Sequence, residues 1–443
     1  MPDFTPHTDD EIAEMLAACG LSDIDELFDA VPEALRLAGG LDMPDVMSEP
    51  DVMVEMNRLA AANSGANLIC FAGGGAYDHE VPAVVRRLGF RSEFVTAYTP
   101  YQPEVAQGVL QMLFEYQTLV ARLAGLAVAN ASLYDGASAL VEAANLAVAA
   151  QRRSVLWVSE GIHPTWREVL RTFAKGTGHE IVEVPLRNGV TDWLAAGDSE
   201  PAALMLAQPN HLGCLEDVGA AADLAHSKGG LCVVAADPVS AGLLRSPGDL
   251  GADVVVGEGQ TFGTPMSFGG PYVGLFATTL EQVRRLPGRL VGETVDTEGR
   301  RAYVTTLRAR EQDIRREKAS SNVCTNQTLI AVAFAIQLSW LGTHGLREMA
   351  LRCARGTRYA REALVAIDGV ELLASAPTLR EFALALPVAP ATVIDRLAEE
   401  GFLAGVALPE ARHHGPGLAV AVTERRTRAE IDAFAAAFEK AVA

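Results

Sequence analysis

Lysine is the scarcest charged residue in this sequence. The 443 residues include 56 acidic and 36 basic residues, and only four of the basic ones are lysine, at positions 175, 228, 318 and 440. A protein that captures an aldehyde coenzyme covalently does so with a lysine, because the imine forms from a primary amine. The sequence therefore leaves few positions for imine chemistry.

Cysteine pairs, export signals and long apolar runs are also missing. Six cysteines are scattered without a CxxC pair or a histidine at metal-ligand spacing, so we expect reduced structural thiols and no metal site. The first ten residues contain no basic region, and no stretch of about 20 residues is continuously apolar. These absences predict a cytoplasmic protein without a membrane span.

The charge balance argues against nucleic acid as a ligand. The formal net charge is −20 and is spread along the chain, which disfavours a sequence-independent grip on phosphate backbones. Hydrophobic residues make up 49% of the chain. This content and length are sufficient for two packed domains.

Two kinds of sequence pattern divide the chain near residue 66. Before it, a capping box at Thr8–Glu11 and further helix signals separated by Gly and Pro predict a helical arm over residues 1–65. After it, apolar strands recur every 22 to 28 residues, which is typical of a doubly wound, mostly parallel sheet in a large α/β domain over residues 66–305. The predicted strands are 154–158, 180–184, 203–207, 231–235 and 253–256.

The second half of the chain predicts a helix and a smaller domain. The gap from Val256 to Tyr272 is too short for a helical crossover, so we expect the strand at 272–276 to be antiparallel. A long polar helix from Thr306 to Gly342 then connects to a small α/β domain over residues 343–443. In that domain we expect strands at 381–386 and 417–422, and helices at 391–400 and after Thr427.

The turn after the strand at 253–256 has the outline of a cofactor-lysine loop. It runs through Gly257-Glu-Gly-Gln260 to Gly269-Gly-Pro271. Fold-type I pyridoxal-phosphate enzymes hold their Schiff-base lysine in such a loop, because the strand end fixes its reach. Gln260 stands at the matching position, and an amide nitrogen is not nucleophilic enough to form an imine. We therefore expect this chain to work with a partner.

Two further segments match parts of a cofactor pocket. Asp135 and Ser138 precede an alanine-rich helical run, whose N-terminus suits an anionic group, although a plain helix cap explains the same residues. Asp237 follows the strand at 231–235, where fold-type I enzymes place the aspartate that pairs with the pyridine nitrogen. A buried turn aspartate before Pro238 is the alternative.

Three loops remain open to more than one interpretation. The three glycines before His79 lack dinucleotide spacing and indicate a tight turn, with His79 as a structural residue rather than a general base. Tyr98 and Tyr101 lie in a loop stiffened by two prolines, which offers donors to a ligand or simply packs. The run of short polar residues at 320–327 competes with helical backbone bonds and predicts fixed partners.

Taken together, these segments resemble the glycine decarboxylase P-protein of the glycine cleavage system, and specifically the separate N-terminal subunit of its split form. The resemblance covers nearly the whole chain. The segments that carry it are Gly75–Val85, Thr96–Glu104, Asn130–Gly136, Gly257–Gln260, Gly269–Pro271 and Arg315–Thr325.

The resemblance implies a fold-type I pyridoxal-phosphate transferase-like architecture and a glycine dehydrogenase (decarboxylating) activity. It implies a homologous C-terminal subunit whose lysine carries the pyridoxal 5'-phosphate, in a heterotetramer with two copies of each subunit. Active sites then lie between unlike subunits, where glycine loses carbon dioxide and the aminomethyl group passes to the lipoyl arm of the H-protein. In this picture the protein groups mainly orient the substrate carboxylate, stabilise charge and exclude water.

The resemblance also implies roles for single residues. Tyr98 and Tyr101 are the best candidates for reaching the partner's site, and Ser321, Asn322 and Thr325 follow. Asp135, Ser138, Asp237 and Gln260 are what is left of a pseudo-site that lost its lysine.

Two other functions remain as alternatives. One is a structural or regulatory pseudoenzyme subunit that only stabilises a partner enzyme. The other is an independent pyridoxal-phosphate enzyme that uses Lys318 or another of the four lysines, although none of them follows the expected strand.

Overall fold

The computed structural model describes residues 6–37, 41–95, 100–267, 269–410 and 415–443. It divides the chain into two compact units, Met1–Ser64 and Gly65–Ala443. Tyr98 of the predicted site lies outside the described residues. The division of residues 66–443 into two domains stays a prediction.

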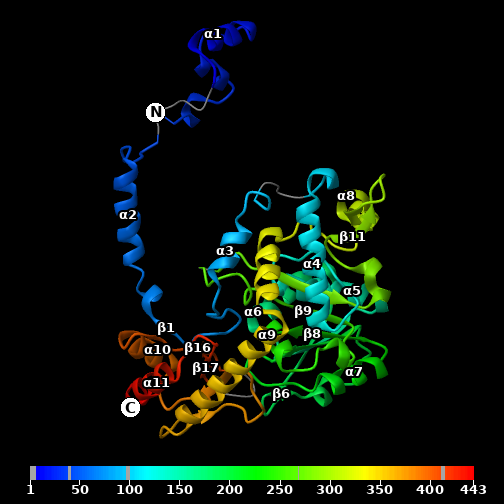
Figure 1. The fold of residues 1–443 in the computed structure, drawn as a ribbon, viewed down its shortest axis with the longest axis vertical. Helices are drawn as coiled ribbons and strands as arrows, with labels where there is room; N and C mark the ends of the chain where they lie inside the picture. The colour runs from blue at the N-terminus through cyan, green and yellow to red at the C-terminus, as the bar shows by residue number, and fades with distance from the viewer. Residues whose placement is uncertain (1–5, 38–40, 96–99, 268, 411–414) are drawn as a thin grey trace. The chain divides into compact units, whose positions relative to one another are not determined.

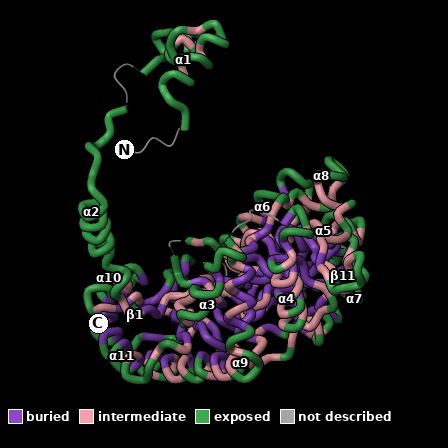
Figure 2. The backbone as a smooth tube through the Cα atoms, turned by 45° about the horizontal axis from the view of Figure 1, so that its top comes forward, coloured by how far each residue is buried: buried purple, intermediate pink, exposed green. Residues whose placement is uncertain are grey.

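The N-terminal unit consists of helices without a core. Helix α1 (Asp9–Ala18) begins with the predicted capping box at Thr8, and α2 (Glu49–Ala61) begins after Ser48. None of the described residues in this unit is buried, and Figure 2 draws both helices in the colours of exposed and intermediate residues only. The unit therefore has exposed apolar side chains but no packed interior of its own.

A seven-stranded sheet forms the centre of the second unit (Figure 1). Its strand order is β2-β10-β9-β8-β7-β3-β4, and β10 is antiparallel to both of its neighbours while the other pairs are parallel. This confirms the parallel sheet and the antiparallel last strand. The strands are β2 (Val128–Ala129), β3 (Val155–Ser159), β4 (Glu180–Val184), β7 (Ala203–Gln208), β8 (Leu231–Ala236), β9 (Val254–Glu258) and β10 (Gly274–Thr278).

Both faces of this sheet are covered, as the unbroken apolar strands require. Successive residues of a strand point to opposite faces of the sheet. In β3, Trp157 packs in the hydrophobic core on one face, and Leu156 and Val158 pack in the core on the other. One face is covered by α4 (Gln107–Ala124), α7 (Val218–Ser227) and α9 (Thr328–Val365), and the other by α5 (Gly136–Gln151) and α6 (Pro164–Thr177). The carboxyl ends of the parallel strands stay open to the loops that form the site.

The helix predicted from Thr306 to Gly342 is wrong over its first half. That stretch contains the end of the hairpin β11 (Leu290–Val295) and β12 (Arg301–Thr306), then α8 (Gln312–Arg315) with short 3-10 turns on either side, then non-helical residues 319–327. The backbone of the polar run makes side-chain hydrogen bonds instead of helical ones: Gln327 N donates to Ser132 Oγ at 3.0 Å, and within the run Val323 N donates to Ser321 Oγ at 3.0 Å.

Helix α9 begins only at Thr328 and continues past Gly342 to Val365, with a kink at Gly342. Of the described helices, only α9 is long and apolar enough to cross a membrane, judged by length and composition alone. However, it packs against α4 and α3 (Ala83–Gly89), and its Phe334 and Ala335 belong to a buried core.

A four-stranded antiparallel sheet closes the C-terminal part. Its order is β13 (Glu371–Leu372), β14 (Glu381–Ala385), β17 (Gly417–Ala421) and β16 (Val406–Leu408). Helices α10 (Pro390–Glu399) and α11 (Arg428–Val442) cover it, and Thr427 forms the expected capping box. The short strand β1 (Ile69–Cys70) pairs with β15 (Phe402–Leu403). The remaining strands, β5 (Leu186–Arg187) and β6 (Val190–Thr191), form a two-stranded hairpin.

Candidate functional site

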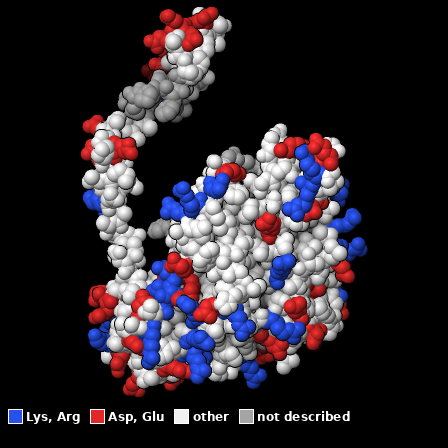
Figure 3. All heavy atoms as spheres, in the orientation of Figure 1, with Lys and Arg blue, Asp and Glu red and all other residues white. Residues whose placement is uncertain are grey.

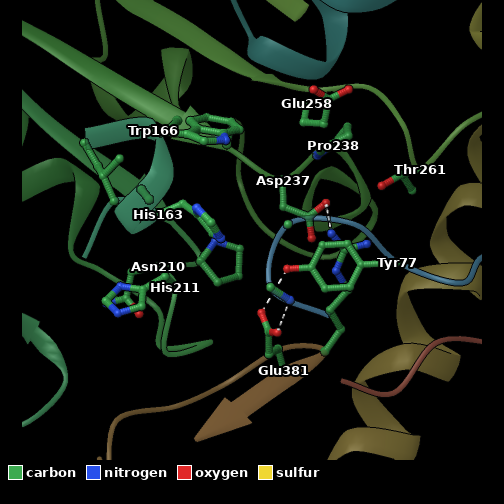
Figure 4. Close-up of a pocket in the computed structure, with 18 residues that line it drawn as sticks. Tyr77, His163, Trp166, Asn210, His211, Asp237, Pro238, Glu258, Thr261 and Glu381 are labelled. Carbon is green, nitrogen blue, oxygen red and sulfur yellow. Dashed lines mark hydrogen bonds and ion pairs between the residues drawn. The ribbon is translucent and has the colours of Figure 1, made fainter. Parts of the chain in front are cut away.

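A small cavity lies at the carboxyl ends of β7, β8 and β9, where open α/β sheets place their ligands (Figure 4). Its volume is about 90 Å³. Asp237 follows β8, Glu258 ends β9, and the loop around Tyr77 and the first residue of β14, Glu381, close the other side. The predicted pseudo-site residue Asp237 is therefore where the sequence placed it.

Asp237 is already paired within the chain. Its Oδ1 lies 3.0 Å from Nη2 of Arg380, whose side chain is only 5% exposed. The Arg380 guanidinium stacks on the Tyr77 ring at 3.5 Å, and the Tyr77 hydroxyl donates to Glu381 at 2.9 Å. The charge that a pyridinium nitrogen would neutralise in a fold-type I site is thus neutralised by an arginine.

The N-terminus of α5 is also occupied by the chain's own carboxylates. Gly136 N donates to Glu258 Oε2 at 2.9 Å, and Ser138 N donates to Asp135 Oδ1 at 2.7 Å. Asp135 therefore caps the helix by accepting from the backbone N–H of Ser138, the alternative that the sequence left open. Burial raises the pKa of Glu258 to about 7. The Trp166 ring covers the same end, since a Cβ on Gly136 would come within 2.2 Å of it.

Gln260 is a structural clamp in place of a lysine. Its side chain is buried, with Nε2 donating to the carbonyls of Thr264 at 2.9 Å and Tyr77 at 3.2 Å. Tyr77 N donates back to Gln260 Oε1 at 3.1 Å. The amide therefore fixes the Tyr77 loop to the loop that follows β9.

A buried chain of polar groups continues from Arg380 to His79 and Glu424. His79 Nε2 contacts Arg380 Nη1, and His79 Nδ1 lies 2.6 Å from Glu424 Oε2. Burial lowers the pKa of His79, so the neutral ring donates from Nδ1 and accepts at Nε2. Cys353 and Glu424 could share a metal ion with His79 by distance alone, but both ring nitrogens are engaged. These contacts support the structural role expected for His79.

These observations together show that the pocket does not fit pyridoxal phosphate. Ligand pockets usually measure about 300–1,000 Å³, whereas this cavity holds about 90 Å³. The amides of Gly136 and Ser138 are taken by carboxylates, Asp237 is paired with Arg380, and Gln260 offers no amine. The polar groups that would hold the cofactor here are therefore already paired within the chain.

Restoring the lysine alone should therefore not restore cofactor binding. We expect the Gln260→Lys variant, mixed with pyridoxal phosphate, to show no imine absorbance and to gain no borohydride-fixed label, because Glu258 and Arg380 still fill the pocket. Absorbance spectra and peptide mass spectrometry measure this, with Gln260→Met as a control without an amine. A pyridoxyl group on residue 260 would contradict it.

The residues predicted to serve a partner's site lie in a different group of loops. Tyr101 is 57% exposed, and the Arg289 guanidinium lies 5.1 Å from its ring. Arg289 Nη2 also donates to Cys324 O at 3.0 Å, which joins the tyrosine loop to the polar run. Within that run, Ser321 and Thr325 are half-buried and Asn322 is exposed.

The polar run is anchored on the loop between β2 and α5. Cys324 N donates to the Tyr134 hydroxyl at 3.1 Å, and Asn326 Nδ2 donates to Ala131 O at 2.8 Å. The fixed partners expected for this run are confirmed. Sequence reasoning missed Arg289, Arg380 and Glu258. Glu258 lies two residues before Gln260 and could have been suspected, whereas nothing in the sequence links Arg380 to Asp237.

Comparison with solved structures defines the class of this fold. The glutamate decarboxylase of Lactobacillus brevis superposes with a TM-score of 0.70 at 14% identity, covering 94% of this chain and 97% of that one. A sphingosine-1-phosphate lyase of Burkholderia pseudomallei superposes with a TM-score of 0.65 at 17% identity, covering 93% and 94%. The architecture is the fold-type I pyridoxal-phosphate-dependent fold, as predicted.

The chain belongs to the glycine cleavage system P-protein family, whose model matches residues 2–438. It is 46% identical to the probable glycine dehydrogenase (decarboxylating) subunit 1 of Desulforamulus reducens and 48% identical to that of Moorella thermoacetica, covering 98% of each chain. A crystal structure of an inhibitor-bound glycine decarboxylase P-protein superposes with a TM-score of 0.92 at 46% identity, covering 99% of this chain and all of that one. The family expected from the sequence motifs is confirmed.

Proposed function

We propose that this chain is the subunit of glycine dehydrogenase (decarboxylating) that carries no cofactor and completes an active site at the interface with a homologous subunit. The observation that carries the proposal is the buried, hydrogen-bonded Gln260 at the lysine position, because a P-protein chain without an imine-forming lysine there needs another chain to supply one. The name "subunit 1" of its relatives also supports a second subunit.

In this proposal the second subunit carries pyridoxal phosphate, which supplies the electron sink for loss of carbon dioxide from glycine. Tyr101, with Tyr98, Ser321, Asn322 and Thr325, orients the substrate and excludes water from the shared site. The aminomethyl group leaves on the lipoyl arm of the H-protein. We expect two copies of each subunit in the cytoplasm, and the six free thiols support a reducing compartment.

Mixing this chain with its second subunit tests the proposal. We expect glycine-dependent exchange of labelled carbon dioxide, in the presence of H-protein, only when both subunits are present, because each lacks part of the site. Each subunit alone and an unrelated fold-type I enzyme serve as controls. Exchange by the second subunit alone, unchanged by adding this chain, would reject the proposal.

The Tyr101→Phe variant then separates a catalytic contribution from a purely structural one. It removes only the hydroxyl, so assembly measured by sedimentation should be unchanged while the exchange rate falls by about tenfold or more. Phe90→Leu, at an exposed aromatic outside the loop, is the control. Full activity of Tyr101→Phe and of the same change at Tyr98 would favour a stabilising pseudoenzyme.

A further inference from the structure

A second cluster of charged side chains lies outside the pocket lined by Asp237 and Glu258. It consists of Arg289, directly before β11, and Arg310 and Glu311, in the turns after β12. We call these three residues the arginine cluster. Arg289 is 9% exposed, and the Glu311 side chain is 10% exposed. Charged side chains are rarely buried to this degree without a complete set of partners.

The cluster has nitrogen atoms without acceptors. Nη1 of Arg289 and both Nε and Nη2 of Arg310 are buried and have no hydrogen-bond partner in the part of the chain that the structure describes. Two of the other nitrogens have backbone acceptors: Arg289 Nη2 donates to Cys324 O, and Arg310 Nη1 donates to Leu286 O. A buried guanidinium nitrogen without an acceptor costs free energy. The cluster thus offers donors that the described chain leaves unused.

Glu311 does not supply the missing acceptor. Its Oε2 lies 3.9 Å from Arg289 Nε, which is too far for a hydrogen bond, and its Oε1 has no partner among the described residues. Burial raises the pKa of Glu311 and lowers the pKa of Arg310. Two guanidinium groups therefore face a single carboxyl group, and one further negative charge would be attracted to the cluster.

The position of the cluster connects it to the shared site. Arg289 lies against the Tyr101 ring and holds the carbonyl of Cys324, so it touches both segments that we assign to the second subunit's active site. Arg310 lies near Arg289, because its Nη1 donates to the carbonyl of Leu286, close to the start of β11. An anion held by both arginines would therefore lie beside the loops that reach the substrate.

We propose that Arg289 and Arg310 bind an oxyanion of a ligand in the active site shared with the second subunit. This rests on the proposed function. Two ligands could supply this oxyanion: glycine through its carboxylate, and the cofactor held by the other subunit through its phosphate. The planar guanidinium fork matches either group and forms charge-assisted hydrogen bonds with it.

The isolated chain provides the first test, which is independent of the second subunit. Inorganic phosphate or acetate should raise Tm more than chloride does at equal ionic strength, because an anion that binds the folded state stabilises it. Arg310→Gln and Arg289→Lys should reduce this difference. The control is Arg308→Gln, since Arg308 is more exposed and pairs with Asp313 at 2.9 Å. Equal shifts for all anions overturn the proposal, whether or not the subunits assemble.

The assembled complex identifies which oxyanion is bound. If the carboxylate of glycine is held, Arg310→Gln raises KM for glycine by about tenfold or more with an unchanged Kd for pyridoxal phosphate. If the cofactor phosphate is held, the Kd rises instead. Arg289→Lys keeps the charge and should retain part of the effect. An assembled, active complex in which neither arginine variant changes KM or Kd overturns the proposal, while failure of the unsubstituted subunits to assemble counts only against the proposed function.

Discussion

Replacing Arg380 with methionine is expected to lower the free energy of unfolding of this chain by about 3–5 kcal/mol, because it leaves a buried carboxylate without its counter-charge. Arg380 pairs with Asp237 at 3.0 Å, stacks on Tyr77 and contacts His79. Methionine keeps much of the side-chain volume, so the loss reports the charge and the hydrogen bonds rather than a cavity. The urea midpoint of the isolated chain measures it.

A matched control and a second substitution sharpen this test. Arg352→Met removes a more exposed arginine, 63% exposed, that pairs with Glu348 at 2.9 Å, and should cost less than about 1 kcal/mol. Adding Asp237→Asn to Arg380→Met should recover part of the stability, because the uncompensated carboxylate is then removed. A loss for Arg380→Met no larger than that for Arg352→Met would contradict the idea that this ion pair fills the former cofactor site.

The large sheet was predictable because its signals are local. Strands such as β8 are unbroken apolar runs, and their spacing alone indicates crossover helices. The start of α9 was not predictable in the same way. Residues 319–327 leave the helix because Asn326 and Gln327 bond to Ala131 and Ser132, nearly two hundred residues earlier in the chain. Tertiary hydrogen bonds of this kind override the helical tendency of the flanking residues.

In the candidate site, too, local features were predictable from the sequence and long-range contacts were not. Gln260 was recognisable because a strand end and a Gly-Gly-Pro turn mark the position of the missing lysine. The pairing of the pocket's polar groups was not recognisable, because each contact joins distant segments: Glu258 accepts from Gly136, and Arg380 pairs with Asp237. The absence of a single amine was visible in the sequence, whereas the groups that replaced the cofactor required the fold.

Deleting residues 1–64 is expected to abolish assembly with the second subunit and, with it, glycine-dependent exchange. The described part of this unit has no buried residue, yet α2 exposes apolar side chains on several sides. Such a segment cannot offset the entropy of ordering by burying its own side chains. Those exposed by 40% or more in α2 are Val52, Met53, Val54, Met56 and Leu59.

The charge of the arm indicates what kind of surface covers it. Residues 1–64 contain fifteen acidic and two basic residues, and Figure 3 shows acidic side chains gathered around α1. We therefore expect the surface of the second subunit that covers the arm to be basic at its rim and apolar at its centre. Association should slow as salt is added, while the apolar contacts keep most of the affinity.

Truncation separates assembly from folding because the packed cores lie in residues 65–443. We expect the truncated chain to keep its circular dichroism spectrum, and its dissociation constant for the second subunit to rise by more than about a hundredfold. Met53→Ser with Met56→Ser should weaken assembly in part. Leu194→Ser, at an exposed leucine of the body, should not. Undiminished assembly and exchange by the truncated chain would contradict this prediction. The helices of residues 1–64, which have no core of their own, would then pack against a surface other than the second subunit.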